Sequence, residues 1–419
     1  MILNPRSCYY GWWVAAAAAG IEFANAATAI GILTVFVIPM SQEFGWTRTE
    51  ITGATSLGAV LGAVLAPFTG RLVDRLGSRL VLTIGGTVVV LGCLYLSAAQ
   101  ALLGFYVAFT LCRISDQGLI KIGASVTAGK WFLRYRGRVT GLVFFASSSG
   151  VIVMAPVVQL VITQWDWRAA WVVLAGVMLC VGVIPSALII RRQPEDLGLT
   201  IDGGPPTQRT TGGPRQRDDD RQWQLSEVTR TSAFWMILAS LFIVSTATSG
   251  IGLHLVPHLV QQGLTPGAAV GAISIMSTAG ALGALVTGFA AERTSPKLLM
   301  TLTYLLGAAS IGVLMVADTL PETYLFAVLQ GLVGSGVNTL APIVWASYYG
   351  RRSLGSIFGL SRAAQVTGFA IGPLVSAIVY DATGTYQQAF ISFSLVAVTA
   401  SLLVMAARRP AVKAPGQMP

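Results

Sequence analysis

Twelve long apolar stretches dominate this chain of 419 residues and restrict how it can fold. Each is about 20 residues or longer, which is enough to cross the hydrocarbon core of a bilayer as a helix. They are apolar on all sides, whereas strands of a membrane β-barrel would alternate. The expected spans lie near residues 10–40, 50–71, 79–99, 103–129, 138–162, 168–190, 233–261, 266–291, 297–317, 322–348, 354–380 and 386–407. The sequence therefore predicts an all-α membrane protein.

Composition and the placement of charge agree with this interpretation. Only 11% of the residues are charged, against about a quarter in soluble domains. Most of the 27 Lys and Arg residues lie in alternate gaps between spans, and the opposite gaps hold only Arg48 and Arg168. This bias predicts that both termini and the central loop face the cytoplasm. The net charge of +10 then reflects topology, and no folded basic face indicates nucleic-acid binding.

A polar stretch divides the spans into two groups of six. The sequence predicts an N-terminal six-helix bundle over 1–190, a cytoplasmic linker over 191–232 and a C-terminal six-helix bundle over 233–419. The linker is rich in Gly, Pro, Arg and Asp, so its middle is expected to be a flexible connection. Nothing in the chain indicates an obligate oligomer, and we expect a monomer in the lipid bilayer.

The two halves also repeat each other at an offset of 218 residues. GRLVDR at Gly70–Arg75 corresponds to GFAAER at Gly288–Arg293, and the same offset relates Gly137 to Gly355 and Gly141 to Gly359. Two related halves are typical of carriers whose substrate binds between them.

Several motifs resemble a known family. GRLVDRLGSRLVL, between the second and third spans, resembles the signature loop of the major facilitator superfamily. RGRVTGLVFFASSSGVIVMAPVVQLV, WDWRAAW, GLHLVPHLV and IGPLVSAIVYDATGTY resemble its bacterial monocarboxylate and oxalate–formate antiporter branch. The resemblance implies a major facilitator fold of 12 transmembrane helices in two pseudo-symmetric bundles. It also implies transport by alternating access across a bacterial inner membrane. Relatives carry an arginine in helix 8 where this chain has Ala284, so the usual carboxylate anchor is absent.

Charged residues beside the signature loop and its repeat predict a cytoplasmic gate. The candidate gate residues are Arg71, Asp74, Arg75, Glu292 and Arg293. Carboxylates there can interact with helix N-termini and with arginines of the other half. In the family this loop is thought to hold the outward-open state. The alternative is that these residues are ordinary topology-setting charges.

Five ionisable residues lie inside spans, where they usually face a cavity or a partner because their insertion into lipid is costly. They are Glu22, Arg113, Asp116, Lys121 and Arg362. Three cations against two acids leave one excess positive charge, which favours an anionic substrate. Two alternatives remain open from the residues alone. Asp116 can neutralise Arg113 three residues away, and Glu22 can pair with Lys121.

The candidate substrate-binding residues extend this set. Arg113, Gln117 and Lys121 are spaced four residues apart and are expected on one helix face. Arg362 lies near mid-membrane, and its guanidinium suits a carboxylate. His254 and Asn25 complete the candidate substrate-binding set. Glu22, Asp116 and His254 are the candidate proton-coupling residues, because they are the acids and the near-neutral base inside spans.

Together these features predict a secondary transporter of a small organic anion, either a mono- or a dicarboxylate. Coupling to protons or exchange for another anion would drive it. The alternative is a drug or metabolite exporter of the same fold with a neutral or cationic substrate. No nucleotide-binding loop, metal-ligand cluster or nucleophile–base motif indicates enzyme chemistry, a cofactor or a metal.

Overall fold

The computed structural model describes residues 9–203 and 223–410, and within these ranges the regular structure is helical throughout. The glycine- and arginine-rich middle of the expected linker, 204–222, lies outside the described residues. The first half contains α1 (Tyr10–Ala24), η1 (Asn25–Thr28), α2 (Ile30–Phe44), α3 (Arg48–Leu76), α4 (Ser78–Ser97), α5 (Leu102–Ser115), η2 (Asp116–Ile120), α6 (Lys121–Trp131), α7 (Arg136–Gln164), α8 (Trp167–Val177), η3 (Met178–Val183) and α9 (Ile184–Ile189).

The connection between the halves holds three short helical turns, followed by six long helices. The turns are η4 (Pro194–Leu197), η5 (Ile201–Gly203) and α11 (Leu225–Val228). The second half contains α12 (Ser232–Gln261), α13 (Pro266–Arg293), α14 (Pro296–Val316), α15 (Leu320–Tyr349), α16 (Leu354–Thr383) and α17 (Gln387–Ala406).

The all-α membrane architecture expected from the sequence is confirmed. Eleven helical segments of the described chain are long and apolar enough to cross a membrane. The expected fourth span runs through α5, η2 and α6 without a gap, and it carries Arg113, Asp116 and Lys121. Those three charges lower its hydropathy, which explains why it is the least apolar crossing.

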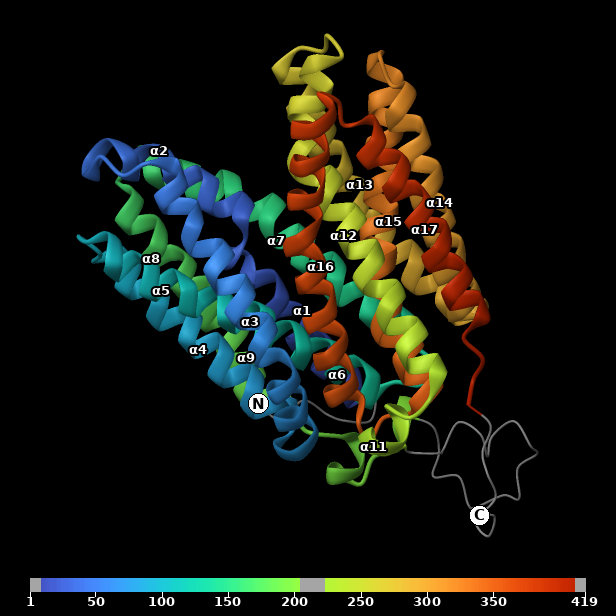
Figure 1. Cartoon of the computed structure of the whole chain (residues 1–419). Helices are drawn as coiled ribbons and strands as arrows, with labels where there is room; N and C mark the ends of the chain where they lie inside the picture. The colour runs from blue at the N-terminus through green and yellow to red at the C-terminus, as the bar shows by residue number, and fades with distance from the viewer. Residues whose placement is uncertain (1–8, 204–222, 411–419) are drawn as a thin grey trace.

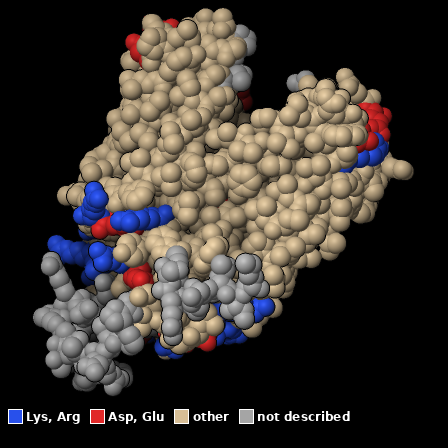
Figure 2. All heavy atoms as spheres, turned by 180° about the vertical axis from the view of Figure 1, so that it is seen from behind, with Lys and Arg blue, Asp and Glu red and all other residues tan. Residues whose placement is uncertain are grey.

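The two halves form a V (Figure 1). They converge at the end that holds α11 and diverge at the opposite end, and Figure 2 shows the notch between the two arms from behind. We call the converging end the linker side. Lys and Arg side chains gather on it, while the flanks of both arms are almost free of charge (Figure 2). An apolar belt of this kind is what a bilayer requires.

Glycines permit the close approach of the halves. The helix α3 packs against α16, and α7 packs against α13. A methyl group at Gly70 would overlap the carbonyl oxygen of Gly355, and one at Gly137 would overlap that of Gly288. These two contacts are related by the 218-residue repeat, since Gly70 matches Gly288 and Gly137 matches Gly355. The backbones therefore touch at two pseudo-symmetric points near the linker side.

We predict that Gly355→Val separates α16 from α3 and shifts the protein toward a state open on the linker side. The added carbon atoms would meet Gly70 and the Asp74 carboxylate. A single cysteine at Asn338, in an otherwise cysteine-free protein, would be alkylated faster from the linker side and more slowly from the opposite side.

The matched control is Gly312→Val in α14, where an added carbon meets no atom within 4 Å. Unchanged labelling from both sides in a correctly folded Gly355→Val protein would contradict the role assigned to this contact.

Candidate functional site

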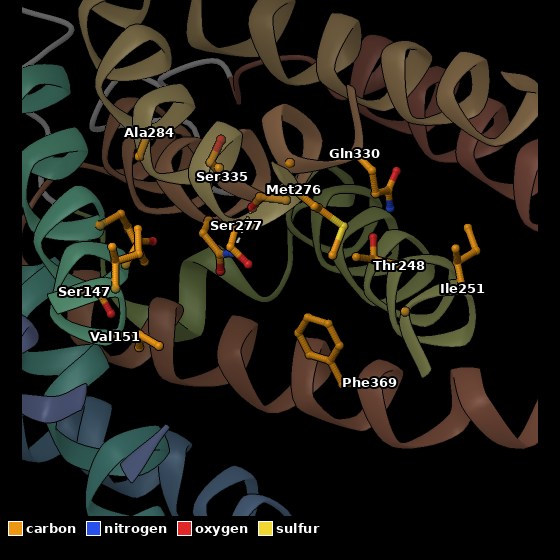
Figure 3. A pocket seen from close by; sticks show the side chains of 18 of the residues that line it. Ser147, Val151, Thr248, Ile251, Met276, Ser277, Ala284, Gln330, Ser335 and Phe369 are labelled. Carbon is orange, nitrogen blue, oxygen red and sulfur yellow. Dashed lines mark hydrogen bonds between the residues drawn. The ribbon is translucent and has the colours of Figure 1, made fainter. Parts of the chain in front are cut away.

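A cavity of about 450 Å³ lies between the two halves. It is lined by α6 and α7 of the first half and by α12, α13, α15 and α16 of the second (Figure 3). Of the described residues that line it, only Lys121 and Arg362 are charged. The remaining lining residues are uncharged and include phenylalanines, aliphatic residues, glycines and small hydroxyl residues. Its volume falls within the usual range of small-molecule sites, about 300–1,000 Å³.

A second cavity of about 220 Å³ extends from the first into the N-terminal half. Both are lined by Lys121, Ser147 and Val151, so the two spaces adjoin. Asn25, Thr28, Arg113, Asp116 and Gln117 belong to the lining of the second cavity. The structure therefore places five of the candidate substrate-binding residues beside these connected cavities: Asn25, Arg113, Gln117, Lys121 and Arg362.

The first span is broken where it meets this site. The helix α1 ends at Ala24, the 3₁₀ turn η1 follows, and Ala29 is extended before α2 begins. A break frees backbone carbonyls that need new partners in a membrane interior. Arg113 Nη1 donates to the Thr28 carbonyl oxygen at 3.1 Å, and Asn25 Nδ2 donates to Asp116 Oδ1 at 2.6 Å. The polar residues of the fourth span thus stabilise the break in the first.

The fourth span is also irregular at this level. Asp116–Ile120 forms a π-helical turn between α5 and α6, a feature found frequently at functional sites. The wider turn interrupts the straight polar stripe expected for Arg113, Gln117 and Lys121. As a result Arg113 lines only the second cavity, whereas Lys121 lines both.

Two of the three cations predicted inside spans have acidic partners. Arg113 Nη1 lies 2.8 Å from Asp116 Oδ2, and Lys121 Nζ lies 2.9 Å from Glu22 Oε2 and 3.8 Å from Asp116 Oδ1. The structure thus contains both pairings that the sequence left open. Glu22 is almost fully buried, with 2% exposure.

Arg362 is the cation without an acidic partner. It is 8% exposed and lies in α16, where Nη1 donates to Gln365 Oε1 at 2.9 Å. Its Nη2 donates across the interface to Gln117 Oε1 at 2.5 Å. Its Nε has no hydrogen-bond partner, and no carboxylate lies within ion-pair distance in the described chain. The excess positive charge is therefore located on Arg362, between the halves.

His254 does not join this site, contrary to the expectation from the sequence. Its Nδ1 lies 3.1 Å from the Tyr386 hydroxyl, and its Nε2 lies 3.2 Å from the Pro373 carbonyl oxygen. It lines neither of the two connected cavities. The histidine and its partner Tyr386 instead connect α12 to the loop between α16 and α17. The sequence indicated that His254 is a near-neutral base inside a span, but it did not indicate which neighbours the imidazole meets.

The linker side holds two matching carboxylate contacts. Asp74 of α3 accepts hydrogen bonds from the backbone N–H groups of Gly355 and Ser356, at 3.0 and 2.8 Å, in the first turn of α16. Glu292 of α13 accepts from the backbone N–H of Arg138 at 2.9 Å, in the first turn of α7. Each acid thus caps the N-terminus of a helix in the other half, where an anion is favoured.

The five candidate gate residues divide into two groups. Asp74 and Glu292 contact the opposite half, and Asp74 also lies 3.5 Å from Lys130 Nζ. Arg71, Arg75 and Arg293 are exposed and make no ion pair within the described part of the chain. The cation that meets Glu292 is Arg138, at 2.7 Å. Arg138 was not among the gate residues expected from the sequence.

Sequence reasoning did not identify several cavity residues. Ser147 accepts a hydrogen bond from Lys121 Nζ at 3.1 Å, and Ser277, Ser335 and Thr248 line the central cavity. Serine and threonine occur throughout the spans, so their presence carried no signal. Ala284, where relatives carry an arginine, also lines the cavity and packs against Gly141.

Two six-helix bundles around a charged central cavity define the membrane carriers that move a solute between halves. The Major Facilitator Superfamily model matches residues 18–327 and 272–418. The chain therefore belongs to the major facilitator superfamily of transporters.

Named relatives and solved structures agree with this assignment. The chain is 24% identical to monocarboxylate transporter 12-B of Danio rerio, over 96% of this chain and 87% of that protein. It is 27% identical to human monocarboxylate transporter 11, over 93% of this chain and 81% of that protein. The crystal structure of the human organic anion transporter MFSD10 superposes with a TM-score of 0.73 at 15% identity, covering 94% of this chain and 99% of that one. FucP, the fucose:proton symporter of E. coli, superposes in its outward conformation with a TM-score of 0.72 at 14% identity. The superposition covers 94% of this chain and 99% of the FucP chain.

We predict that Lys121→Met destabilises the protein more than Glu22→Gln does. Without Lys121, the buried Glu22 carboxylate loses its cation, whereas without Glu22 the ammonium still has Asp116 nearby. Breaking a buried pair costs about 3 kcal/mol or more. Thermal unfolding of the purified protein measures the difference.

The double variant Glu22→Gln/Lys121→Met provides the control, since it removes both charges together. We expect it to unfold at a higher temperature than Lys121→Met alone. Additive losses would show that the two side chains are not energetically coupled.

We predict that Asp74→Asn lowers the transport rate without lowering the amount of protein in the membrane. An amide offers one acceptor oxygen where the carboxylate offers two, so one cap on α16 and the attraction of Lys130 are lost. Asp381→Asn, at the exposed opposite end of α16, is the matched control. Equal transport by both variants and the parent would argue against a gate at Asp74.

Proposed function

We propose that this protein is a secondary transporter of a small organic anion, a carboxylate, that works by alternating access. The observation that carries the proposal is the position of Arg362. Its guanidinium lines the central cavity, has no acidic partner and keeps one N–H without a hydrogen bond. A charged donor held this way is suited to bind a carboxylate through two parallel hydrogen bonds.

The balance of charge around the cavity supports an anion over a cation. Glu22 and Asp116 are the acids of the cluster, and Lys121 and Arg113 already neutralise them. A cationic drug would meet Arg362 and no free carboxylate among the described lining residues. The lining therefore supplies no counter-charge for the cationic substrate of the exporter alternative. The relatives named as monocarboxylate transporters and the fold neighbour titled an organic anion transporter are consistent with an anionic substrate.

We further propose that the linker side faces the cytoplasm. The Lys and Arg residues concentrated there follow the positive-inside rule. The structure then represents the outward-open state, with the cavity open to the exterior. Residence in a bacterial inner membrane rests on the sequence resemblance, since the relatives named above are animal proteins.

Coupling is proposed to use Glu22 or Asp116, as a proton site, or a second anion in exchange. Glu22 and Lys121 form a buried pair beside the cavity, so protonation of the acid would release the ammonium toward a substrate. Uptake driven by an imposed pH gradient supports symport. Uptake that requires a trapped internal anion supports exchange.

We predict that Arg362→Gln reduces uptake of carboxylates into proteoliposomes at least a hundredfold, and that Arg362→Lys retains part of it. Glutamine removes the positive charge and the paired N–H donors of the guanidinium. Lysine keeps the charge but cannot form the two parallel hydrogen bonds to a carboxylate. Labelled mono- and dicarboxylates, with and without a pH gradient, are the substrates for the screen.

The control is Arg352→Gln, which removes an exposed cation ten residues away on the linker side. Full activity of Arg362→Gln would overturn the anion site. Competition by organic cations, without competition by carboxylates, would establish the exporter alternative instead.

A further inference from the structure

The wall of the cavity that belongs to the second half is rich in hydrogen-bond acceptors. Ser277 Oγ donates to the Ile273 carbonyl oxygen at 2.9 Å, and Ser335 Oγ donates to that of Leu332 at 3.0 Å. Asn338 Nδ2 donates to the Gly334 carbonyl oxygen at 2.9 Å. Each of these side chains donates to a carbonyl oxygen of its own helix. The lone pairs on both serine oxygens and on Asn338 Oδ1 remain available to accept.

The opposite part of the cavity is rich in donors. Arg362 and Lys121 are cations, and Ser147 accepts from Lys121, so its hydroxyl proton is left to donate. Figure 3 shows Ser147 on a helix of the first half and Ser277 and Ser335 on helices of the second. The helices that carry these two serines, α13 and α15, pack directly against each other. The cavity thus has a donor end near the first half and an acceptor wall of Ser277, Ser335 and Asn338 on α13 and α15. Gln330 of α15 adds a donor beside this wall, since its Oε1 accepts from Ser310 and its Nε2 is left to donate.

The acceptor wall is electrically neutral. No acid lines the central cavity among the described residues. An ammonium or guanidinium group would lie there without a counter-charge, which is unfavourable in a partly desolvated site. Hydroxyl groups match neutral acceptors without adding charge. The partners that complement this wall are therefore neutral O–H donors.

The donor end admits one negative charge. Arg113 and Lys121 are balanced by Asp116 and Glu22, so Arg362 supplies the single uncompensated positive charge. A second carboxylate would have no cation to meet it. The apolar surfaces of Phe144 and Phe369 also line the cavity, and they offer contact to the C–H groups of a substrate.

We propose that the substrate is a polyhydroxylated monocarboxylate of the sugar-acid type. Its carboxylate binds Arg362, with Ser147 and Lys121 nearby, and its hydroxyl groups donate to Ser277, Ser335 and Asn338. The proposal rests on the organic-anion function above and specifies the part of the substrate distant from its charge.

Four six-carbon probes separate the contributions of charge and hydroxyl groups. They are D-gluconate, hexanoate, D-glucitol and D-glucarate, tested by calorimetry on the full-length protein in lipid nanodiscs. D-gluconate is expected to bind at least tenfold more tightly than each of the others. Hexanoate lacks the hydroxyl groups, D-glucitol lacks the carboxylate, and D-glucarate carries a second charge.

Each contrary outcome has a distinct meaning. Hexanoate binding as tightly as D-gluconate would overturn the hydroxyl specificity while leaving the anion function intact. D-glucarate binding more tightly would overturn the single-charge requirement. If D-glucitol binds and neither D-gluconate nor hexanoate does, the anion function itself is wrong.

A double variant tests the wall directly. Ser277→Ala/Ser335→Ala removes two acceptors and is expected to weaken D-gluconate binding roughly tenfold, because each hydrogen bond contributes modestly. Hexanoate binding should not change. The matched control is Thr278→Ala/Ser347→Ala, which removes two hydroxyls bonded to carbonyls of the same helices but outside the cavity lining. Equal loss for both probes, or no loss for D-gluconate, would overturn the proposal.

Discussion

The contact of helix backbones at Gly70·Gly355 and Gly137·Gly288 is the constraint on which the rest of the structure depends. It holds the linker side shut, and the cavity therefore opens on the other side. The acids Asp74 and Glu292 reach helix N-termini of the opposite half only because these backbones touch. Both glycine contacts and both caps obey the 218-residue repeat. A pseudo-symmetric repeat allows the equivalent ends of the bundles to close in turn, which is the geometry of alternating access.

The irregular helices and the buried charges explain each other. A break in the first span and a π turn in the fourth would leave backbone groups unsatisfied in a purely apolar setting. Arg113 donates to the Thr28 carbonyl oxygen at the break, and the side chains of Asn25 and Asp116 are hydrogen-bonded to each other between the two spans. This arrangement fixes the fourth-span side chains beside the cavity. On its first-half side the cluster therefore also stabilises the irregular helices. Only its edge, at Lys121 and Arg362, faces the central space where a ligand can bind.

The sequence was informative wherever a signal was rare. Charged residues are uncommon inside spans. For that reason Arg362, Lys121 and Glu22 could be named as candidate site residues from their positions alone. Hydrophobic length and the repeat likewise predicted the all-α membrane fold. The break after Ala24 and the π turn at Asp116 carry no proline signal, because they depend on contacts between distant spans. The structure places His254 against Tyr386 and Pro373 and outside the lining of the two cavities, which its position in the sequence did not indicate. Ser277 and Ser335 were missed because back-bonded serines are frequent in membrane helices.

Gln117 shows how binding at this site can act on both halves. Its Nε2 donates to Asp116, and its Oε1 accepts from Arg362 across the interface. A carboxylate that reaches Arg362 replaces this neutral acceptor with a charged one, and charge-assisted hydrogen bonds are roughly twice as strong. The exchange keeps Arg362 Nη2 hydrogen-bonded throughout, while the link between the halves passes from the Gln117 side chain to the substrate. A ligand shifts a conformational equilibrium only through contacts that differ between states. A carboxylate bound by both Arg362 and the first half meets that condition, because its contacts with the protein depend on how closely the two halves approach.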